Sequence, residues 1–136
     1  TLCFITACNA TEAKKEAVTM GANASLMKTS WWVEDIAGKG VIDMSHTTIE
    51  FDEGGRVGGD TGCNRYFGSA EIDGREIKFG PLAGTRKACH VPLMDQDSKF
   101  FQAMGKVVSW EIADTGLLHL RDSAGNDQLR ASQITK

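Results

Sequence analysis

From Trp31 onward, the chain consists of short runs in which apolar and polar residues alternate, separated by glycine-containing turns. Residues 46–52 alternate in this way, as expected of a strand with one buried face. Residues 70–79 form two such runs around Asp73-Gly74, a pair typical of a two-residue type I′ hairpin turn. Fifteen glycines against two prolines agree with many tight turns. This pattern restricts the chain to a domain built mainly of antiparallel sheet.

One segment departs from the alternation. The stretch from Pro92 to about Val107 is expected to form a helix, because its apolar residues recur at helical spacing. Its predicted buried stripe consists of Phe100, Phe101, Met104 and Val108. Further strands are expected at residues 31–36, 109–113, 117–121 and 128–131. Strands, one helix and then more strands indicate the α+β class, with mainly antiparallel β-structure.

The N-terminal residues carry a localisation signal. The four residues Ile5-Thr6-Ala7-Cys8 resemble a lipobox, in which apolar and small residues precede a cysteine that becomes acylated. Residues 1–8 are therefore interpreted as the remnant of a lipoprotein signal peptide, with lipidation at Cys8. The following residue is Asn9 rather than Asp, which favours the outer membrane, facing the periplasm.

The remainder divides by composition. Residues 9–30 are small and polar, without an apolar stripe, and are predicted to be a flexible tether. Residues 31–136 are predicted to be the globular domain. The net charge of −3 lacks the basic excess typical of nucleic-acid-binding domains. No apolar run approaches the roughly 20 residues needed to cross a bilayer. We therefore expect a membrane partner through the N-terminal lipid, no nucleic acid, and a monomer.

Two segments and their flanks resemble a known family. The string Gly59-Asp60-Thr61-Gly62-Cys63-Asn64-Arg65-Tyr66-Phe67-Gly68 is similar to the G-x-x-x-C-N-R-[FY]-x-G segment of META domains, the family of the heat-shock protein HslJ. The string from Pro81 to Cys89, PLAGTRKAC, is similar to the family's L-A-x-T-R-x-x-C segment. The flanking matches are Trp32, Asp35 and Gly38 at the start, and Trp110, Leu118 and Leu120 near the end.

The resemblance covers about residues 31–131. It implies a small, partly open β-barrel with one packed helix, found in bacterial envelope proteins. It also implies roles described as phenotypes: heat-shock induction, resistance to an antibiotic such as novobiocin, motility and virulence. The family has no established reaction, so the resemblance implies none. The barrel also resembles that of the pilotins, which escort secretin subunits to the outer membrane, but only at the level of fold.

Cys63 and Cys89 are the cysteines inside the predicted domain. An even pair in an exported protein favours a disulfide, which would contribute roughly 3 kcal/mol by closing the loop between them. Reduced structural thiols, a reactive cysteine and a metal site that includes His90 remain alternatives. His46 and His119 lack the spacing of zinc ligands, so no metal and no cofactor are expected.

Arg65 and Arg86 lie close to these cysteines in sequence. Either they bind an anion or a lipid headgroup, or they pair with Asp35, Asp60 or Glu71; the ion pair is favoured. Asn64 is expected to cap a turn rather than bind a ligand. Three tryptophans and two phenylalanines are expected in the core, with one or two of them lining an opening: Trp31, Trp32, Trp110, Phe100 and Phe101.

No Ser/His/Asp set, phosphate loop or acid–base pair is present in the sequence, so an enzyme is not expected. Two hypotheses remain: an accessory envelope lipoprotein that binds a lipid or protein, and a structural stress-protective protein without a small ligand. A packed interior would mean that the domain acts through its surface. An apolar slot beside Trp31 or Trp32 would instead admit an acyl chain. The residues expected to fill the interior with the helix are Phe51, Ile72, Ile77, Phe79, Trp110 and Leu118.

Overall fold

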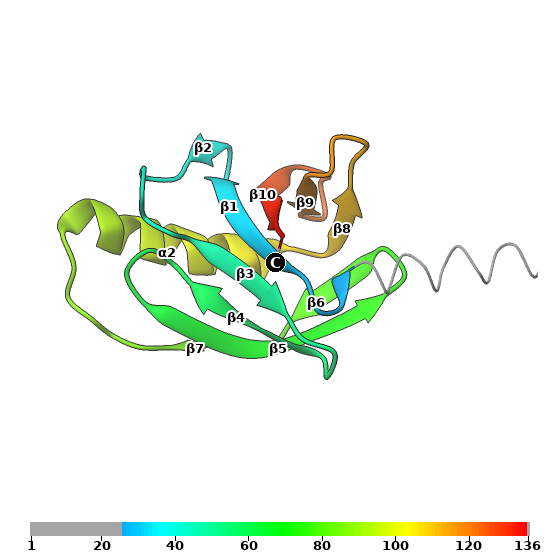
Figure 1. The fold of residues 1–136 in the computed structure, drawn as a ribbon, viewed down its shortest axis with the longest axis horizontal. Helices are drawn as coiled ribbons and strands as arrows, with labels where there is room; N and C mark the ends of the chain where they lie inside the picture. The colour runs from blue at the N-terminus through cyan, green and yellow to red at the C-terminus, as the bar shows by residue number, and fades with distance from the viewer. Residues whose placement is uncertain (1–25, 136) are drawn as a thin grey trace, which may run out of the picture.

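The computed structural model describes residues 26–135, which form a barrel of eight antiparallel strands and a long helix (Figure 1). The barrel strands are β1 (Ser30–Ile36), β3 (Thr48–Phe51), β4 (Arg56–Asp60), β5 (Arg65–Asp73), β6 (Glu76–Phe79), β8 (Ser109–Ile112), β9 (Leu118–Arg121) and β10 (Asp127–Ile134). The predicted α+β class with mainly antiparallel sheet is confirmed. Cys8, the predicted signal-peptide remnant and the predicted tether up to residue 25 lie outside the described residues.

The ring of strands is closed, whereas the family resemblance implied a partly open barrel. The last strand, β10, pairs with β9 on one side and with β1 on the other, so the first and last strands of the domain meet. The narrowest seam lies between β6 and β8, which share one paired position, Glu76 with Ser109. Closure leaves the ring without a free edge.

Two short strands attach to this ring: β2 (Lys39–Gly40) beside β1, and β7 (Ala83–Gly84) beside β5. The long strand β5 divides its pairing on one side. Its second half pairs with β6 over residues 70–73, and its first half pairs with β7 at Tyr66 and Phe67. Strand β7 has no other partner strand among the described residues.

The hairpin predicted around Asp73-Gly74 is present, but its turn type differs. Asp73 pairs with Glu76, so Gly74 and Arg75 are the two loop residues. Gly74 has a φ of 62°, and Arg75 is not among the residues with positive φ. Positive φ at the first loop residue alone is the pattern of a type II′ turn, which needs glycine only there. The turn therefore lies one residue later in the chain than the sequence suggested.

The helix α2 (Val91–Lys106) matches the predicted segment, with proline in its first turn. Phe100, Ala103 and Met104 are buried against the barrel, and the Phe100 ring lies 4.9 Å from that of Tyr66 on β5. Val108, predicted to complete the buried stripe, lies beyond the end of the helix and is 44% exposed. The chain turns extended at Val107, so helical spacing no longer applies to Val108.

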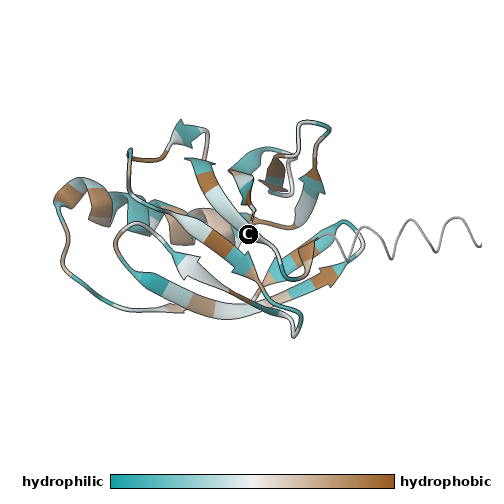
Figure 2. Ribbon diagram, viewed as in Figure 1, coloured by the Kyte–Doolittle hydropathy of each residue, from teal (hydrophilic) through white to brown (hydrophobic). Residues whose placement is uncertain are grey.

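Side chains from the strands and the helix fill the interior of the barrel. Figure 2 shows apolar and polar residues alternating along the strands. Those with less than 2% of their surface exposed include Trp31, Ile49, Tyr66, Phe100, Met104, Leu118, Leu120 and Leu129. Trp110 is also buried, whereas Trp32, predicted to belong to the core, is 41% exposed. Neighbouring residues of a strand face opposite sides, so Trp31 and Trp32 cannot both point inward.

The domain starts before Trp31, where the sequence placed the boundary. Leu26 is fully buried in the core, and the Thr29 side chain accepts a hydrogen bond from the Trp31 indole at 2.8 Å. A single buried leucine in a polar stretch shows no periodicity, so the pattern could not reveal it. Within residues 26–135, no helix combines the length and apolar character needed to span a membrane.

Gly59 is the residue whose replacement we expect to be most disruptive. It has a φ of 151°, and a Cβ atom there would lie 2.3 Å from the Thr48 carbonyl oxygen of the neighbouring strand. Gly59→Ala should lower the free energy of unfolding by about 3 kcal/mol, through strain and steric overlap. Urea denaturation measures this change.

Gly38→Ala is the matched control. Gly38 also has positive φ, 84°, but a Cβ atom there would meet nothing within 4 Å. Gly38→Ala should lower the free energy of unfolding by about 1 kcal/mol, because only the backbone conformation is strained. Equal losses in the two variants would contradict the role assigned to the close approach of β3 at Gly59.

Candidate functional site: the disulfide-linked loop

The turn between β4 and β5 is organised by its own side chains. The Thr61 hydroxyl accepts hydrogen bonds from the backbone N–H groups of Cys63 and Asn64, at 3.2 and 2.9 Å. The Asp60 carboxylate accepts one from the Gly62 N–H at 2.8 Å. Gly62 has a φ of 100°, which favours glycine. These bonds fix the direction in which Cys63 and Asn64 leave the turn.

A disulfide joins this turn to the loop that precedes α2. Cys63 and Cys89 are bonded, with their Cα atoms 6.1 Å apart and a separation of 26 positions in sequence. The bonded state removes the alternatives of free thiols and of thiolate metal ligands. Among residues 26–135, no group of three or more His, Cys, Asp or Glu side chains is placed to hold a metal ion.

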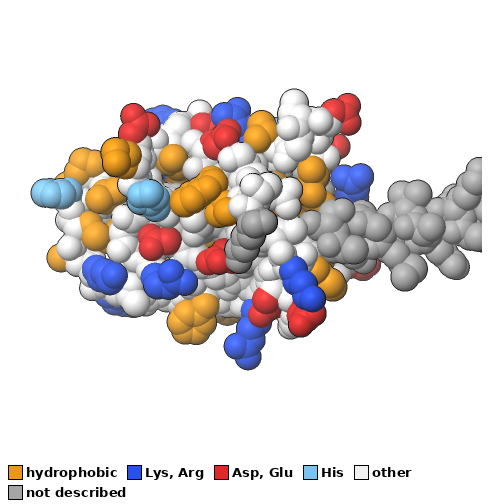
Figure 3. Space-filling view, in the orientation of Figure 1, with side chains coloured by type: hydrophobic (Ala, Val, Ile, Leu, Met, Phe, Trp, Pro, Cys, Tyr) orange, Lys and Arg blue, Asp and Glu red, His pale blue; other side chains and the backbone are white. Residues whose placement is uncertain are grey.

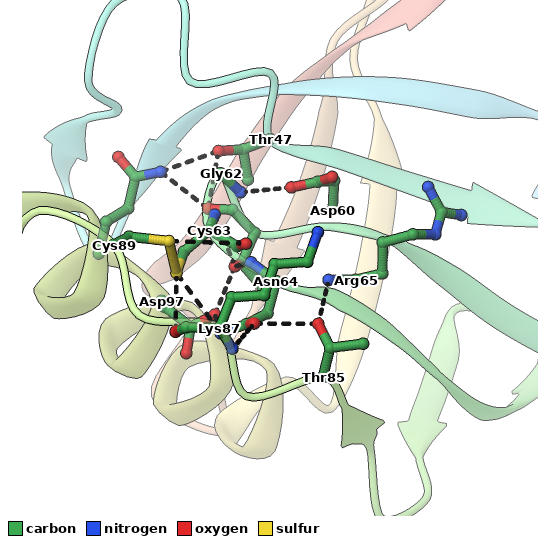
Figure 4. Close-up of a disulfide and its surroundings, with 12 residues drawn as sticks. Thr47, Asp60, Gly62, Cys63, Asn64, Arg65, Thr85, Lys87, Cys89 and Asp97 are labelled. Carbon is green, nitrogen blue, oxygen red and sulfur yellow. Dashed lines mark hydrogen bonds between the residues drawn. A yellow bond between two sulfur atoms is a disulfide. The ribbon is translucent and has the colours of Figure 1, made fainter.

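Asn64 ties the same loop to the turn through hydrogen bonds (Figure 4). Its buried side-chain oxygen accepts from the Lys87 backbone N–H at 2.7 Å and from the Thr85 hydroxyl at 2.9 Å. Its side-chain N–H donates to the Asp97 carboxylate at 3.3 Å. The amide is therefore occupied by structural contacts, and the expected turn-organising role describes it better than ligand binding does.

Two polar residues of α2, Gln96 and Asp97, complete this arrangement. The Gln96 side-chain N–H donates to the Thr47 hydroxyl and to the Thr61 carbonyl, both at 2.9 Å. The Thr61 hydroxyl donates a short hydrogen bond to Asp97. We refer to the five side chains Thr47, Thr61, Asn64, Gln96 and Asp97 as the polar cluster. Figure 4 shows Thr47, Asn64 and Asp97 of this cluster beside the disulfide.

The sequence analysis did not identify Gln96 and Asp97. A signal for them exists: they precede Phe100 and Phe101 by four residues and so lie on the same face of the helix. Polar residues on the buried face of a helix require partners, because burial without hydrogen bonds is costly. Those partners come from Thr47, just before β3, and from the β4–β5 turn, which the sequence alone does not place beside the helix.

Arg65 and Arg86 are exposed, and neither forms an ion pair within residues 26–135. The favoured interpretation, pairing with Asp35, Asp60 or Glu71, is therefore wrong. Asp35 pairs instead with Arg130 at 2.6 Å, because β1 and β10 are neighbours in the closed ring. Asp35 thus finds its ion-pair partner through the pairing of two strands that are far apart in sequence.

The backbones of the segments that carry the two arginines are adjacent, but the two side chains line different hollows. Arg65 and Thr85 are hydrogen-bonded neighbours across β5 and the loop, with Thr85 N–H to Arg65 O at 3.0 Å. The Arg65 side chain lines a hollow of about 560 Å³ on the outer face of β4 and β5, together with the exposed Phe67. Arg86 lines another hollow of about 730 Å³ between β7, the loop and α2, together with Lys87.

Among residues 26–135, no acyl-chain slot opens beside Trp31. Trp31 is fully buried and lines none of the hollows described here. The hollow beside Trp32, about 350 Å³, is lined by the exposed loop residues Ile42 and Met44 and lies outside the barrel. The filled interior leaves the outer surface as the place where this domain can contact other molecules.

Reduction of the disulfide gives a direct test of its contribution. In the oxidised chain, Cys63 and Cys89 should resist alkylation after denaturation, and reductant should lower the free energy of unfolding by about 3 kcal/mol. Peptide mass mapping identifies the labelled cysteines, and urea titration gives the stability. A Cys63→Ala/Cys89→Ala variant is the control, since reductant should leave its midpoint unchanged. Full labelling of both residues in the oxidised protein would contradict the disulfide.

Burial raises the pKa of Tyr66 well above its ordinary value, and the charges of Glu50 and Asp60 add to the effect. Tyr66 is the one tyrosine of the chain, so its ionisation can be followed by absorbance. In the unfolded chain tyrosine ionises near pH ~10, whereas the folded domain keeps the proton. The unfolded state therefore binds fewer protons above this pH, and the free energy of unfolding should fall as the pH rises further.

Tyr66→Phe provides the comparison. It removes the hydrogen bond from the hydroxyl to the Thr48 carbonyl, 2.8 Å long, and should cost about 1 kcal/mol at neutral pH. The stability difference between wild type and variant should shrink as the pH rises above about 10. A difference that stays constant up to pH ~11.5 would show that Tyr66 ionises normally in the folded domain.

Comparison with known proteins agrees with this architecture. A protein from Burkholderia xenovorans, solved by NMR, is 24% identical, with a TM-score of 0.70 over 85% of this chain and 88% of that one. A DUF4847 family protein from Bacteroides vulgatus, solved by crystallography, is 14% identical, with a TM-score of 0.60 over 82% of this chain and 96% of the other. These similarities establish a shared fold. No curated protein matches the chain.

The family comparison is more specific. The model of the META domain matches residues 24–134, which include the β4–β5 turn, the disulfide-linked loop, α2 and the whole barrel. The match also begins before Trp31, in agreement with the buried Leu26. The chain belongs to the META domain family.

Proposed function

We propose that this chain is a non-catalytic accessory protein of the bacterial cell envelope, anchored by lipid at Cys8 and facing the periplasm from the outer membrane. The observation that carries the proposal is the disulfide between Cys63 and Cys89. Disulfides persist in oxidising compartments such as the periplasm and are rare in the cytosol. The lipobox-like residues before Cys8 supply the anchor in this proposal.

The accessory role is exerted through the outer surface. The interior is filled by residues such as Trp31, Phe100 and Leu118, so a small ligand has no room inside the barrel. The surface beside the disulfide offers Arg86 and Lys87 without ion-pair partners among the described residues. In this proposal, the domain holds an envelope protein or lipid partner there and thereby supports the envelope under stress or under a novobiocin-type antibiotic.

The filled interior also favours a second candidate, a structural stress-protective protein without a specific ligand. The two candidates differ in one measurable respect. An accessory protein loses its effect when the surface beside the disulfide is altered while the fold is kept. A purely structural protein keeps its effect as long as the domain is stable.

Cys8→Ser separates the anchor from the domain. When the protein is expressed from its own gene, the variant should leave the membrane fraction and accumulate as a folded periplasmic protein with its disulfide intact. Membrane fractionation followed by thiol labelling measures both properties. Cys3→Ser is the matched control, since the residue directly before Cys3 is Leu2 rather than the small residue of a lipobox, and it should remain with the membrane.

The same strains test the proposed role in antibiotic resistance. Loss of the gene should increase sensitivity to novobiocin, and the wild-type gene should restore resistance where Cys8→Ser does not. Continued membrane association of the Cys8→Ser protein would contradict lipid anchoring. Complete reduction of Cys63 and Cys89 in cells would contradict residence in the periplasm.

A further inference from the structure

We propose that the free edge of β7 binds an extended acidic peptide segment of another protein, which adds to the sheet as a further strand. The place is the hollow between β7 and α2, which we call the β7–α2 trough; its lining includes Gly84, Arg86, Lys87, Met94, Ser98 and Phe101. This inference rests on the proposed surface role and specifies the chemistry of the partner.

The first argument concerns the backbone of Gly84. In an antiparallel pair, hydrogen-bonded positions alternate with positions whose N–H and C=O groups point away. Thr85 donates to Arg65 O at 3.0 Å, so Arg65 and Thr85 occupy a hydrogen-bonded position, and the next position, Tyr66 opposite Gly84, does not. Gly84 therefore directs its N–H and C=O away from β5, toward the trough.

No strand covers this edge within residues 26–135, because β7 lies outside the closed eight-stranded ring and pairs only with β5. The edge exists because two strands share one side of β5. Strand β6 pairs with β5 from Ala70 to Asp73, and β7 pairs with the earlier residues Tyr66 and Phe67. An exposed strand edge is a template for strand addition, in which main-chain hydrogen bonds supply affinity.

The second argument concerns the side chains around the edge. The wall opposite β7 is apolar in part, with Met94 46% exposed and Phe101 half-buried. The trough continues into a second hollow of about 470 Å³, which shares Leu82 and Phe101 with it. An added strand could therefore place alternate side chains against an apolar surface.

The third argument concerns charge. Arg86 and Lys87 line the trough and make no ion pair within the described residues. The acidic residue of the lining is Asp97, whose carboxylate already accepts hydrogen bonds from Thr61 and Asn64. The uncompensated charge of the trough is positive, so a segment that alternates acidic and apolar residues complements both the rim and the wall.

The probe is the peptide acetyl-Asp-Val-Asp-Val-Asp-Val-Asp-amide, titrated into the full chain and followed by amide NMR. We expect saturable binding with shifts at the amides of Leu82, Gly84 and Arg86. In the free protein the Gly84 amide should exchange rapidly with solvent, and the peptide should slow this exchange. The same peptide with Lys in place of Asp should bind at least tenfold more weakly.

Two N-methylated forms of the peptide test strand addition without altering the protein. In the proposed complex, the peptide is antiparallel to β7, with a valine directly opposite Gly84. The N–H of that valine points at β7, and its side chain lies on the inward face of the sheet. Methylation of the valine amides should therefore abolish binding, while methylation of the aspartate amides should leave it largely intact. Equal binding by both forms would overturn strand addition.

Protein variants test the charge. Arg86→Ala/Lys87→Ala should weaken binding about fivefold, as expected for two exposed charge pairs. Lys78→Ala is the matched control, because the exposed Lys78 lies on β6 and lines a different hollow, and it should bind like wild type. Equal affinity of the double variant and the wild type would overturn the acidic partner.

Other occupants give different results. Slow exchange of the Gly84 amide in the free, monomeric chain would mean that another part of the chain covers the edge, and would overturn the proposal. Concentration-dependent dimerisation with protection of Gly84 would assign the edge to a second copy and overturn it as well. Failure to bind the peptide would leave the fractionation of Cys8→Ser unaffected, so the inference and the proposed function fail independently.

Discussion

The buried side chain of Asn64 is the contact on which the arrangement of the site depends. It accepts hydrogen bonds from Thr85 and Lys87 of the loop and donates one to Asp97 of α2, so a single amide sets the positions of three segments. Loss of this side chain would remove three part-buried hydrogen bonds, each of which contributes about 1 kcal/mol to stability. The disulfide of Cys63, the adjacent residue, connects two of these segments covalently, the β4–β5 turn and the loop before α2.

The polar cluster also explains how the barrel and the helix can be packed so completely. Gln96 bonds to Thr47 and Thr61, which places α2 against the β4–β5 turn and directs Phe100 onto Tyr66. With the interior filled, the chemistry available to a partner is confined to the outside. Figure 3 shows that charged and apolar side chains are interspersed on one face of the molecule. Recognition then depends on local features, such as a strand edge beside uncompensated cations.

Most of the architecture could be predicted from local patterns, and the differences have identifiable causes. The Asp73-Gly74 hairpin and the helix from Pro92 follow from turn chemistry and apolar spacing, which act within a few residues. Val108 does not belong to the predicted buried stripe, because the helix ends at Lys106 and apolar spacing does not reveal where a helix ends. The burial of Leu26 could not be predicted, because a single apolar residue in a polar stretch forms no periodic pattern. The ion-pair partner of Asp35 depended on the pairing of β1 with β10.

The sequence by itself determined the class of fold, the cysteine pair and the family resemblance carried by the segments around Cys63 and Cys89. These properties reside in residue types and short spacings. Only the tertiary structure decided that the ring closes, that Gln96 and Asp97 join Asn64, and that Arg65 and Arg86 line different hollows. The physical reason is that strand pairing and buried hydrogen bonds join residues far apart in the chain, and their partners are fixed only when the whole barrel packs.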